Sequence, residues 1–329
     1  MKRYLPLLFA AALCLLSGCG GRSVTTRLVI SSMGVDCAAS PLTAVLEIIK
    51  EEQNELMTVQ GESFAELFSA AERQSGEQLY LGALQSIVFS GIADGSTLRA
   101  YLFSLMADGR IAPNTQIALC DDALSVLSED ITGDDITALL TCRYTDCRSC
   151  GLKEFINLLD GEGRDGLLPW LSTEEGKLRE SGFLPTGSSD YTEPLPPDDL
   201  CRLLLRRTDE TRRALSVDGS EVTVLLRRLA VSGVRYEQRE TEVNLSAEVT
   251  VQAVNGTVPT RAALETALRN DLLKQLEMLE NTVMHSRRSD ILGLAARAAL
   301  AGFDADAIDL SRITFVPRFV LRDPRGLLA

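Results

Sequence analysis

The chain has 329 residues, a formal net charge of −13, 5% aromatic side chains and a single histidine. A chain with this negative charge is expected to repel nucleic-acid phosphates. The charge also argues against a basic surface that binds anionic lipid. Its length is enough for one large domain or two ordinary ones.

The first residues form an export signal. Lys2 and Arg3 precede an uncharged, mainly apolar run at residues 4–16, which is shorter than the roughly 20 residues that span a bilayer. The run ends in Leu-Ser-Gly-Cys at residues 16–19, a branched residue, two small residues and a cysteine. This lipobox pattern predicts a bacterial lipoprotein signal peptide at 1–18 and lipidation of Cys19.

A diacylglycerol thioether on Cys19 would supply two acyl chains, enough for stable anchoring without a transmembrane helix. The cysteine and a flexible tether occupy residues 19–26, and the folded body is expected outside the cytoplasm, close to the membrane. Without Lys2 and Arg3, the mature chain has 31 basic and 46 acidic residues, a formal charge of −15.

The first half of the body alternates strand and helix patterns, which predicts a mixed sheet with helices packed on it. Ser96 is expected to be an N-cap, and the segment at 34–40 a turn. The predicted strands are 28–33, 42–49, 79–89 and 115–119, and the predicted helices are 62–73, 96–106, 121–127 and 133–159.

Glycines at 161, 163 and 166 interrupt the last helical pattern, and residues 185–197 are rich in Pro, Gly, Ser and Asp. We therefore expect an N-terminal α+β domain at 27–192, with one or two subdomains, and a C-terminal α+β domain at 193–329.

The second half has the clearest periodicity. Residues 242–251 alternate strictly between apolar and polar, which indicates a half-buried strand of an antiparallel sheet, and residues 222–226 begin the same pattern. Thr260 is the expected N-cap of a long helix whose apolar stripe runs from Leu264 to Val283. A helix at 290–300 and a strand at 313–321 follow, so the predicted fold is an antiparallel sheet packed on a long helix.

Six cysteines remain after Cys14 and Cys19, and they leave three alternatives open: disulfides, free thiols or a zinc site. A zinc site would lack a fourth ligand near the 142–150 cluster, since the one histidine is far away. The six are Cys37, Cys120, Cys142, Cys147, Cys150 and Cys201.

Catalytic motifs are missing from the sequence, so we expect no enzyme, no cofactor and no metal. His285 lies late in the long helix with no nucleophile nearby in sequence. The acidic pairs Asp134-Asp135 and Asp198-Asp199 are expected to cap helices or face solvent, although a hydrolase using carboxylates alone stays open.

Four short segments follow one another along the chain. The lipobox precedes a predicted strand ending in Met-Gly-Val-Asp at 33–36, residues 79–85 are Leu-Tyr-Leu-Gly-Ala-Leu-Gln, Ala123 and Leu124 lie in a predicted helix after a strand, and residues 289–294 are Ser-Asp-Ile-Leu-Gly-Leu. In this order the segments resemble the Ger(x)C family, the lipoprotein C subunits of spore germinant receptors. The second segment is similar to the family's apolar-Gly-His-x-Gln stretch, with Ala83 in place of the histidine, and the last to the family's Ala-Asp-Ile-Phe-Gly-Phe.

The resemblance implies a non-enzymatic, lipid-anchored subunit of a nutrient germinant receptor, with an α+β fold. Such a subunit acts through protein contacts at the outer face of the inner spore membrane, beside integral membrane subunits of the A type and the B type. Direct contact with a small-molecule germinant is left open. The alternative is the solute-binding lipoprotein of an ABC-type transporter.

Overall fold

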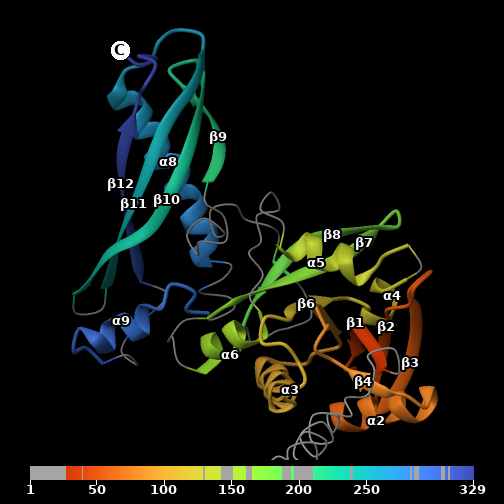
Figure 1. Cartoon of the computed structure of the whole chain (residues 1–329). Coiled ribbons are helices and arrows are strands. Elements are labelled where there is room, and N and C mark those ends of the chain that lie inside the picture. Colours follow the sequence, from red (N-terminus) through yellow and green to blue (C-terminus); the bar gives the residue numbers. More distant parts are fainter. Residues whose placement is uncertain are drawn as a thin grey trace, which may run out of the picture.

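The computed structural model describes residues 27–329 apart from 39, 129, 142–150, 161–164, 187–193, 196–209, 238–239, 282–283, 285–288, 305–307 and 310–311. The chain forms two sheets with helices against them, so the predicted α+β class is confirmed (Figure 1). Several predicted features lie outside the described residues: Cys19, the cysteines at 142, 147, 150 and 201, Asp198-Asp199, His285 and the 192/193 domain boundary.

The N-terminal sheet is mixed, as predicted. Its order is β3-β2-β1-β5-β6-β7-β8, with β4 pairing β1, and β1, β5, β6 and β7 run parallel. Its strands are β1 (Arg27–Asp36), β2 (Leu42–Ile48), β3 (Glu55–Gly61), β4 (Gln78–Tyr80), β5 (Ser86–Ser90), β6 (Gln116–Cys120), β7 (Leu167–Glu174) and β8 (Lys177–Pro185).

Strand β1 is longer than predicted. Residues 34–36 were expected in a turn, but they pair with β2 on one side and β5 on the other. A central strand covered on both faces reads as a continuous apolar run, and Met33 and Val35 are both fully buried. The glycine between them was therefore misread as a turn signal.

The prediction of one strand at 79–89 was wrong, because a turn divides this apolar run into β4 and β5. The backbone N–H of Leu84 donates to the carbonyl of Leu81 at 3.1 Å, and both side chains are buried. An apolar run shows burial but does not by itself distinguish a strand from a buried turn.

Helices cover both faces of this sheet. Helices α2 (Phe64–Ser75), α3 (Gly95–Ala107) and α6 (Leu152–Asp160) contribute to one apolar cluster, and α4 (Ala123–Val126) and α5 (Gly133–Thr141) to another. The N-cap of α3 is Asp94, which accepts from Thr97 N, and not Ser96 as predicted. The predicted helix at 133–159 is two helices, α5 and α6.

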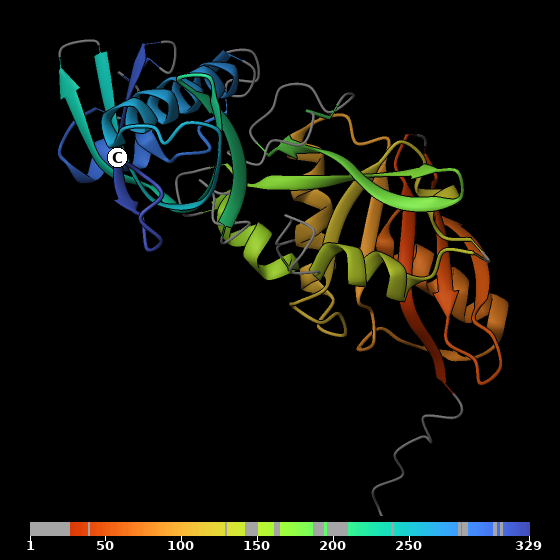
Figure 2. The same cartoon turned by 90° about the horizontal axis from the view of Figure 1, so that it is seen from above.

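The C-terminal sheet has the order β12-β11-β10-β9, and α8 (Arg261–Leu279) lies along one face of it (Figure 2). Thr260 caps α8 as predicted, by accepting from Ala263 N. The predicted stripe is a core face, since Leu264, Leu268, Leu272, Leu276 and Leu279 are buried against the sheet. The strands are β9 (Glu210–Val217), β10 (Ser220–Glu237), β11 (Glu240–Asn255) and β12 (Ile313–Arg322).

The expectation of a purely antiparallel C-terminal sheet was wrong at one strand. Strands β9, β10 and β11 are antiparallel, and β11 alternates buried and half-buried residues as predicted. Strand β12 instead pairs with β11 in parallel. A parallel neighbour needs a crossover connection, and here α8 and α9 (Leu294–Leu300) provide it.

The two cores meet at the β7–β8 hairpin. Leu167 and Phe183, together with Leu195, pack in the same cluster as the C-terminal sheet and α8. Neighbouring hairpin residues such as Leu168 and Leu184 pack in the N-terminal cluster. Among the described residues, no helix is both long enough and apolar enough to cross a membrane.

Candidate functional site at the junction of the two sheets

The segment 289–294, singled out in the sequence, lies at the junction of the two sheets. Asp165 precedes β7, and its Oδ2 accepts hydrogen bonds from Ser289 Oγ at 2.8 Å and from Asp290 N at 2.7 Å. The backbone N–H of Asp165 donates in return to the carbonyl of Asp290 at 3.1 Å. Three hydrogen bonds thus join residues more than 120 positions apart in the chain.

The side chain of Asp290 has a separate role, because it caps α9. Its Oδ1 accepts from Leu294 N at 2.9 Å and its Oδ2 from Ala295 N at 2.8 Å. Gly293 has a φ of 66°, a left-handed conformation that favours glycine. The helix predicted from residue 290 therefore begins at Leu294, since Asp290 is its capping residue and lies outside it.

The junction is buried. Ser289, Ile291 and Leu294 are fully buried, and Tyr236 Oη donates to the carbonyl of Leu294 at 3.0 Å. Burial raises the pKa of Asp290, the backbone bonds from Ala295 and Leu294 lower it, and the nearby charge of Asp165 raises it. The net shift is upward, so the folded protein disfavours the ionised form of this carboxyl.

This geometry suits a fixed joint. A buried hydroxyl and three backbone N–H groups use the oxygens of two carboxylates, and removing an acceptor would leave buried donors unpaired. The apolar contacts of Leu167 and Phe183 lie in the same cluster as Ile291 and Leu292. The junction can therefore hold the two sheets in one relative arrangement.

Two other segments of the resemblance contact each other. Gly34 in β1 packs against the start of α4, where a Cβ on residue 34 would lie 3.0 Å from the carbonyl carbon of Ala123 and closer still to its oxygen. Such an approach has no room for a side chain. The glycine at 34 thus serves close packing between the strand and the helix, and Ala123 is the small residue that it meets.

The segment 79–85 connects β4 to β5 and ties three strands together through its backbone. Gln85 N donates to the carbonyl of Ser31 at 2.7 Å, and Gln116 N donates to the carbonyl of Gln85 at 2.7 Å. The side chain of Gln85 is exposed and that of Ala83 is half-buried. The structure thus gives this segment a backbone role between β1 and β6.

Cys37 and Cys120 are free thiols, so neither forms a disulfide. Burial raises the pKa of Cys37 to about 12, with a further increase from Asp36, and burial also raises the pKa of Cys120 strongly. The thiolate is the reactive form of cysteine. Both thiols are therefore protonated at neutral pH and suit packing better than nucleophilic catalysis.

The acidic pair at 134 and 135 lies in the first turn of α5, which begins at Gly133, and Asp135 caps the helix as predicted. Asp135 Oδ2 accepts from Thr132 N at 2.9 Å and from Thr132 Oγ1 at 2.8 Å. These hydrogen bonds lower the pKa of Asp135. Within the described ranges, no three His, Cys, Asp or Glu side chains lie together as a metal site would require.

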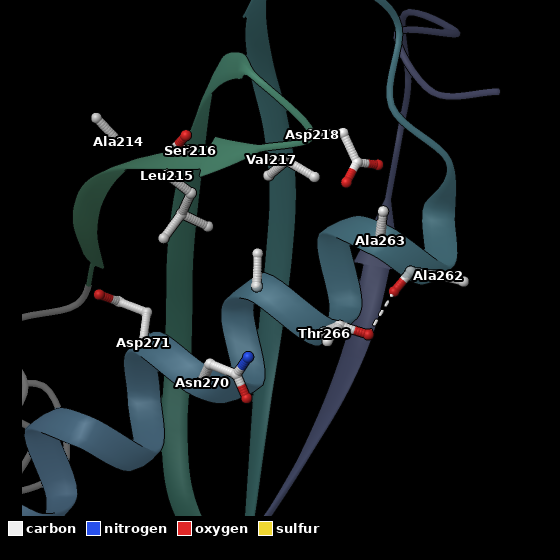
Figure 3. A pocket seen from close by; sticks show the side chains of 11 residues that line it. Ala214, Leu215, Ser216, Val217, Asp218, Ala262, Ala263, Thr266, Asn270 and Asp271 are labelled. Atoms are coloured by element: carbon white, nitrogen blue, oxygen red, sulfur yellow. Dashed lines mark hydrogen bonds between the residues drawn. The ribbon is translucent and has the colours of Figure 1, made fainter.

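An open groove of about 630 Å³ separates β9 from α8 (Figure 3). Small side chains line the helix side, among them Ala263 and Thr266, and the hydroxyl of Thr266 donates to its own helix at the carbonyl of Ala262. Asp271, at one end, is paired with Arg213 at 3.0 Å. Thr266 and Asp271 are thus already engaged within the protein.

A smaller pocket of about 200 Å³ lies at the carboxyl ends of β5 and β6. Phe89, Leu119 and Trp170 give it apolar walls, and Ser90 and Asp121 add polar groups. Ligands of open sheets with parallel strands bind at this end of the strands. The position is suited to a small molecule, although no sequence pattern predicted a pocket there.

Two α+β units joined through a half-buried carboxylate define the structural class, and comparisons with known proteins agree with it. Residues 21–173 match the family model described as "Spore germination protein N-terminal domain". The fold matches a solved structure described as "Crystal Structure of the GerBC protein", with a TM-score of 0.58 and 10% identity over 89% of this chain and 97% of that one. A search of curated proteins finds no match.

The family model covers a little under half of the chain, and the resemblance of the chain to the Ger(x)C family is confirmed. The fold of GerBC extends over both sheets of this chain.

Proposed function

We propose that the chain is a lipid-anchored subunit of a nutrient germinant receptor. The observation that carries this proposal is the match of residues 21–173 to a spore germination domain, followed by a C-terminal unit that completes the fold of GerBC. The proposed partners are integral membrane subunits of the A type and the B type, and the proposed site of action is the outer face of the inner spore membrane.

The anchor is proposed to be Cys19, eight residues before the first described residue, Arg27. A chain of eight residues spans at most roughly 28 Å. Strand β1 would therefore start within a short distance of the lipid headgroups. The lipidation proposal rests on the lipobox at residues 16–19 and is tested by Cys19→Ala, which should leave the protein without lipid and remove it from membranes that are washed with high salt.

The proposed mode of action is contact with other proteins. The described thiols and Asp135 have packing or capping roles, and residues 289–294, one of the segments that resemble the family, form one side of the junction between the two sheets. The solute-binding alternative finds less support, because binding lobes repeat parallel strand–helix units in both halves. Here three of the four C-terminal strands are antiparallel neighbours.

Germination of spores that lack this chain tests the proposal. We expect loss of the response to at least one nutrient, with normal spore yield and heat resistance, and restoration by the intact chain. Complementation with Cys19→Ala should restore little or none of the response. Spores that lack the chain yet respond like the parent to every nutrient that triggers the parent would contradict the proposed role.

A further inference from the structure

The face of the C-terminal sheet that points away from α8 carries a concentration of arginines. The strand registers place Arg212 opposite Leu225 and Arg227 opposite Glu248, with alternate residues of β12 completing the rows. Five exposed arginines make up this surface. We call them the outer-face arginines: Arg212, Arg227, Arg228, Arg318 and Arg322.

Acidic residues neutralise only part of this charge. Arg227 pairs with Glu210, and both Arg228 and Arg322 pair with Glu248, at 2.8 and 3.4 Å. Five arginines against two glutamates leave a local charge of +3, on a chain whose overall charge is −13. Arg212 and Arg318 form no ion pair within the described part of the chain.

Farther along the same face, Arg235 and Glu242 lie opposite each other, and the exposed Glu221 and Glu240 lie toward the two ends of the sheet, so the excess of positive charge is confined to the outer-face arginines. In the row between the arginines of β12, Val320 is 58% exposed. An exposed valine flanked by Arg318 and Arg322 gives the face an apolar point within a cationic surface. Basic side chains around exposed apolar groups are typical of surfaces that lie on the lipid headgroup region.

We propose that this outer face binds the anionic headgroups of a phospholipid membrane. Charges in solution act over about 10 Å at 0.1 M salt, so the acidic residues elsewhere on the chain are screened from a membrane that touches this face. Each basic side chain near an anionic bilayer adds about 1 kcal/mol of attraction. The net charge argued against a basic surface because it sums charges that the fold places on different faces of the protein.

The position of the face favours a membrane over an acidic protein as its partner. In Figure 2 the outer face of the C-terminal sheet and the start of β1 turn toward the same side of the molecule, with α8 on the opposite side of its sheet. A lipid on Cys19 and a headgroup contact at the outer face could thus share one plane. The membrane contact does not require the germinant-receptor role, and the test below omits the lipid.

Vesicle sedimentation tests the proposal with the chain from residue 19 onward carrying Cys19→Ser, which keeps every described residue. Vesicles of phosphatidylcholine with phosphatidylglycerol are compared with phosphatidylcholine alone, at low and high salt. The test variant is Arg212→Gln with Arg318→Gln, because neither arginine has an ion pair to lose among the described residues. The control is Arg73→Gln with Arg269→Gln, two exposed helix residues outside the C-terminal sheet, with the same change in net charge.

We expect salt-sensitive binding to the anionic vesicles only, roughly tenfold or more weaker for the Arg212/Arg318 variant and unchanged for the control. Circular dichroism should show both variants folded. Absence of binding to anionic vesicles, or an equal loss in both variants, would overturn the proposal. The proposal would also be overturned if the parent chain did not bind vesicles but bound a membrane protein, and if replacing Arg212 and Arg318 abolished that binding. The face would then contact protein.

Discussion

Replacement of Asp165 tests the junction most sharply. Its Oδ2 accepts from both Ser289 Oγ and Asp290 N, so a single oxygen receives both side-chain bonds of the joint. Asp165→Ala removes this acceptor. Asp165→Asn can place an amide oxygen at the same position and accept both bonds without the charge. Both variants also remove the like charge that raises the pKa of Asp290, so that effect cancels between them.

The expected magnitude follows from the burial of the donors. Ser289 is fully buried, and a buried donor without a partner costs about 1–3 kcal/mol. With two donors and some relaxation, Asp165→Ala should lower the free energy of unfolding by about 2–4 kcal/mol. Neutral hydrogen bonds have roughly half the strength of charge-assisted ones, so Asp165→Asn should lower it by about 1 kcal/mol.

Urea unfolding measures both values, provided that the slope with denaturant stays the same in all three proteins. Small-angle scattering should show a broader distribution of distances for Asp165→Ala, because the two sheets would lose part of their fixed arrangement. An alanine variant as stable as the asparagine variant, or a loss below about 1 kcal/mol for alanine, would refute the role of these hydrogen bonds.

The other predictions concern packing and titration. Gly34→Ala should destabilise the fold by about 1–3 kcal/mol in urea unfolding, because the new Cβ meets the backbone of the neighbouring helix; unchanged stability would contradict this close packing. Leu272→Ala should cost about 2–5 kcal/mol in the same assay if the helix stripe is core. Since the folded-state pKa of Asp290 is raised above its ordinary 3.8, its contribution to stability is present below pH 3.8 and is lost as pH rises through the folded value. Asp290→Asn should remove this acid-range slope, measured by thermal unfolding across pH. The thiol of Cys120 should resist iodoacetamide at neutral pH until the protein unfolds, and rapid labelling of the native protein by mass spectrometry would contradict its burial.

Periodic patterns predicted the helices and strands that have one buried face and one exposed face. Strand β11 has one face on α8 and one toward solvent, so its alternation was readable, and α8 presents one apolar stripe to the same core. Elements buried on both sides lose this signal. Strand β1 was predicted too short for that reason, and the turn between β4 and β5 is as apolar as the strands that it joins.

Two hairpins had a local signal that the prediction missed. Asp218-Gly219 forms the two-residue turn between β9 and β10, with φ values of 50° and 79°, and an Asp-Gly pair between strand patterns is typical of such turns. Glu175-Gly176 forms the same kind of turn between β7 and β8. The parallel direction of β12 has no local sequence signal. It depends on the end of the sheet at which the chain re-enters after α8 and α9.

The sequence indicated only one of the two segments that form the junction. Residues 289–294 stood out through the family resemblance, but nothing near Asp165 marks it as their acceptor, since a contact across 124 positions has no local signature. Asp290 lies three residues before Gly293, the N-cap of α9, and its carboxylate accepts from the first N–H groups of the helix from there. The prediction instead placed Asp290 inside the helix.

The most direct test of the central claim is to identify what this chain binds in the membrane. Membranes of dormant spores would be solubilised in mild detergent, and the tagged chain would be purified and its partners identified by quantitative mass spectrometry, with a tagged, unrelated lipoprotein as control. The germinant-receptor role predicts two multi-span membrane proteins, enriched over the control and in constant ratio to the chain. Recovery of an ABC permease and its ATPase, or of no membrane protein above the control, would contradict it.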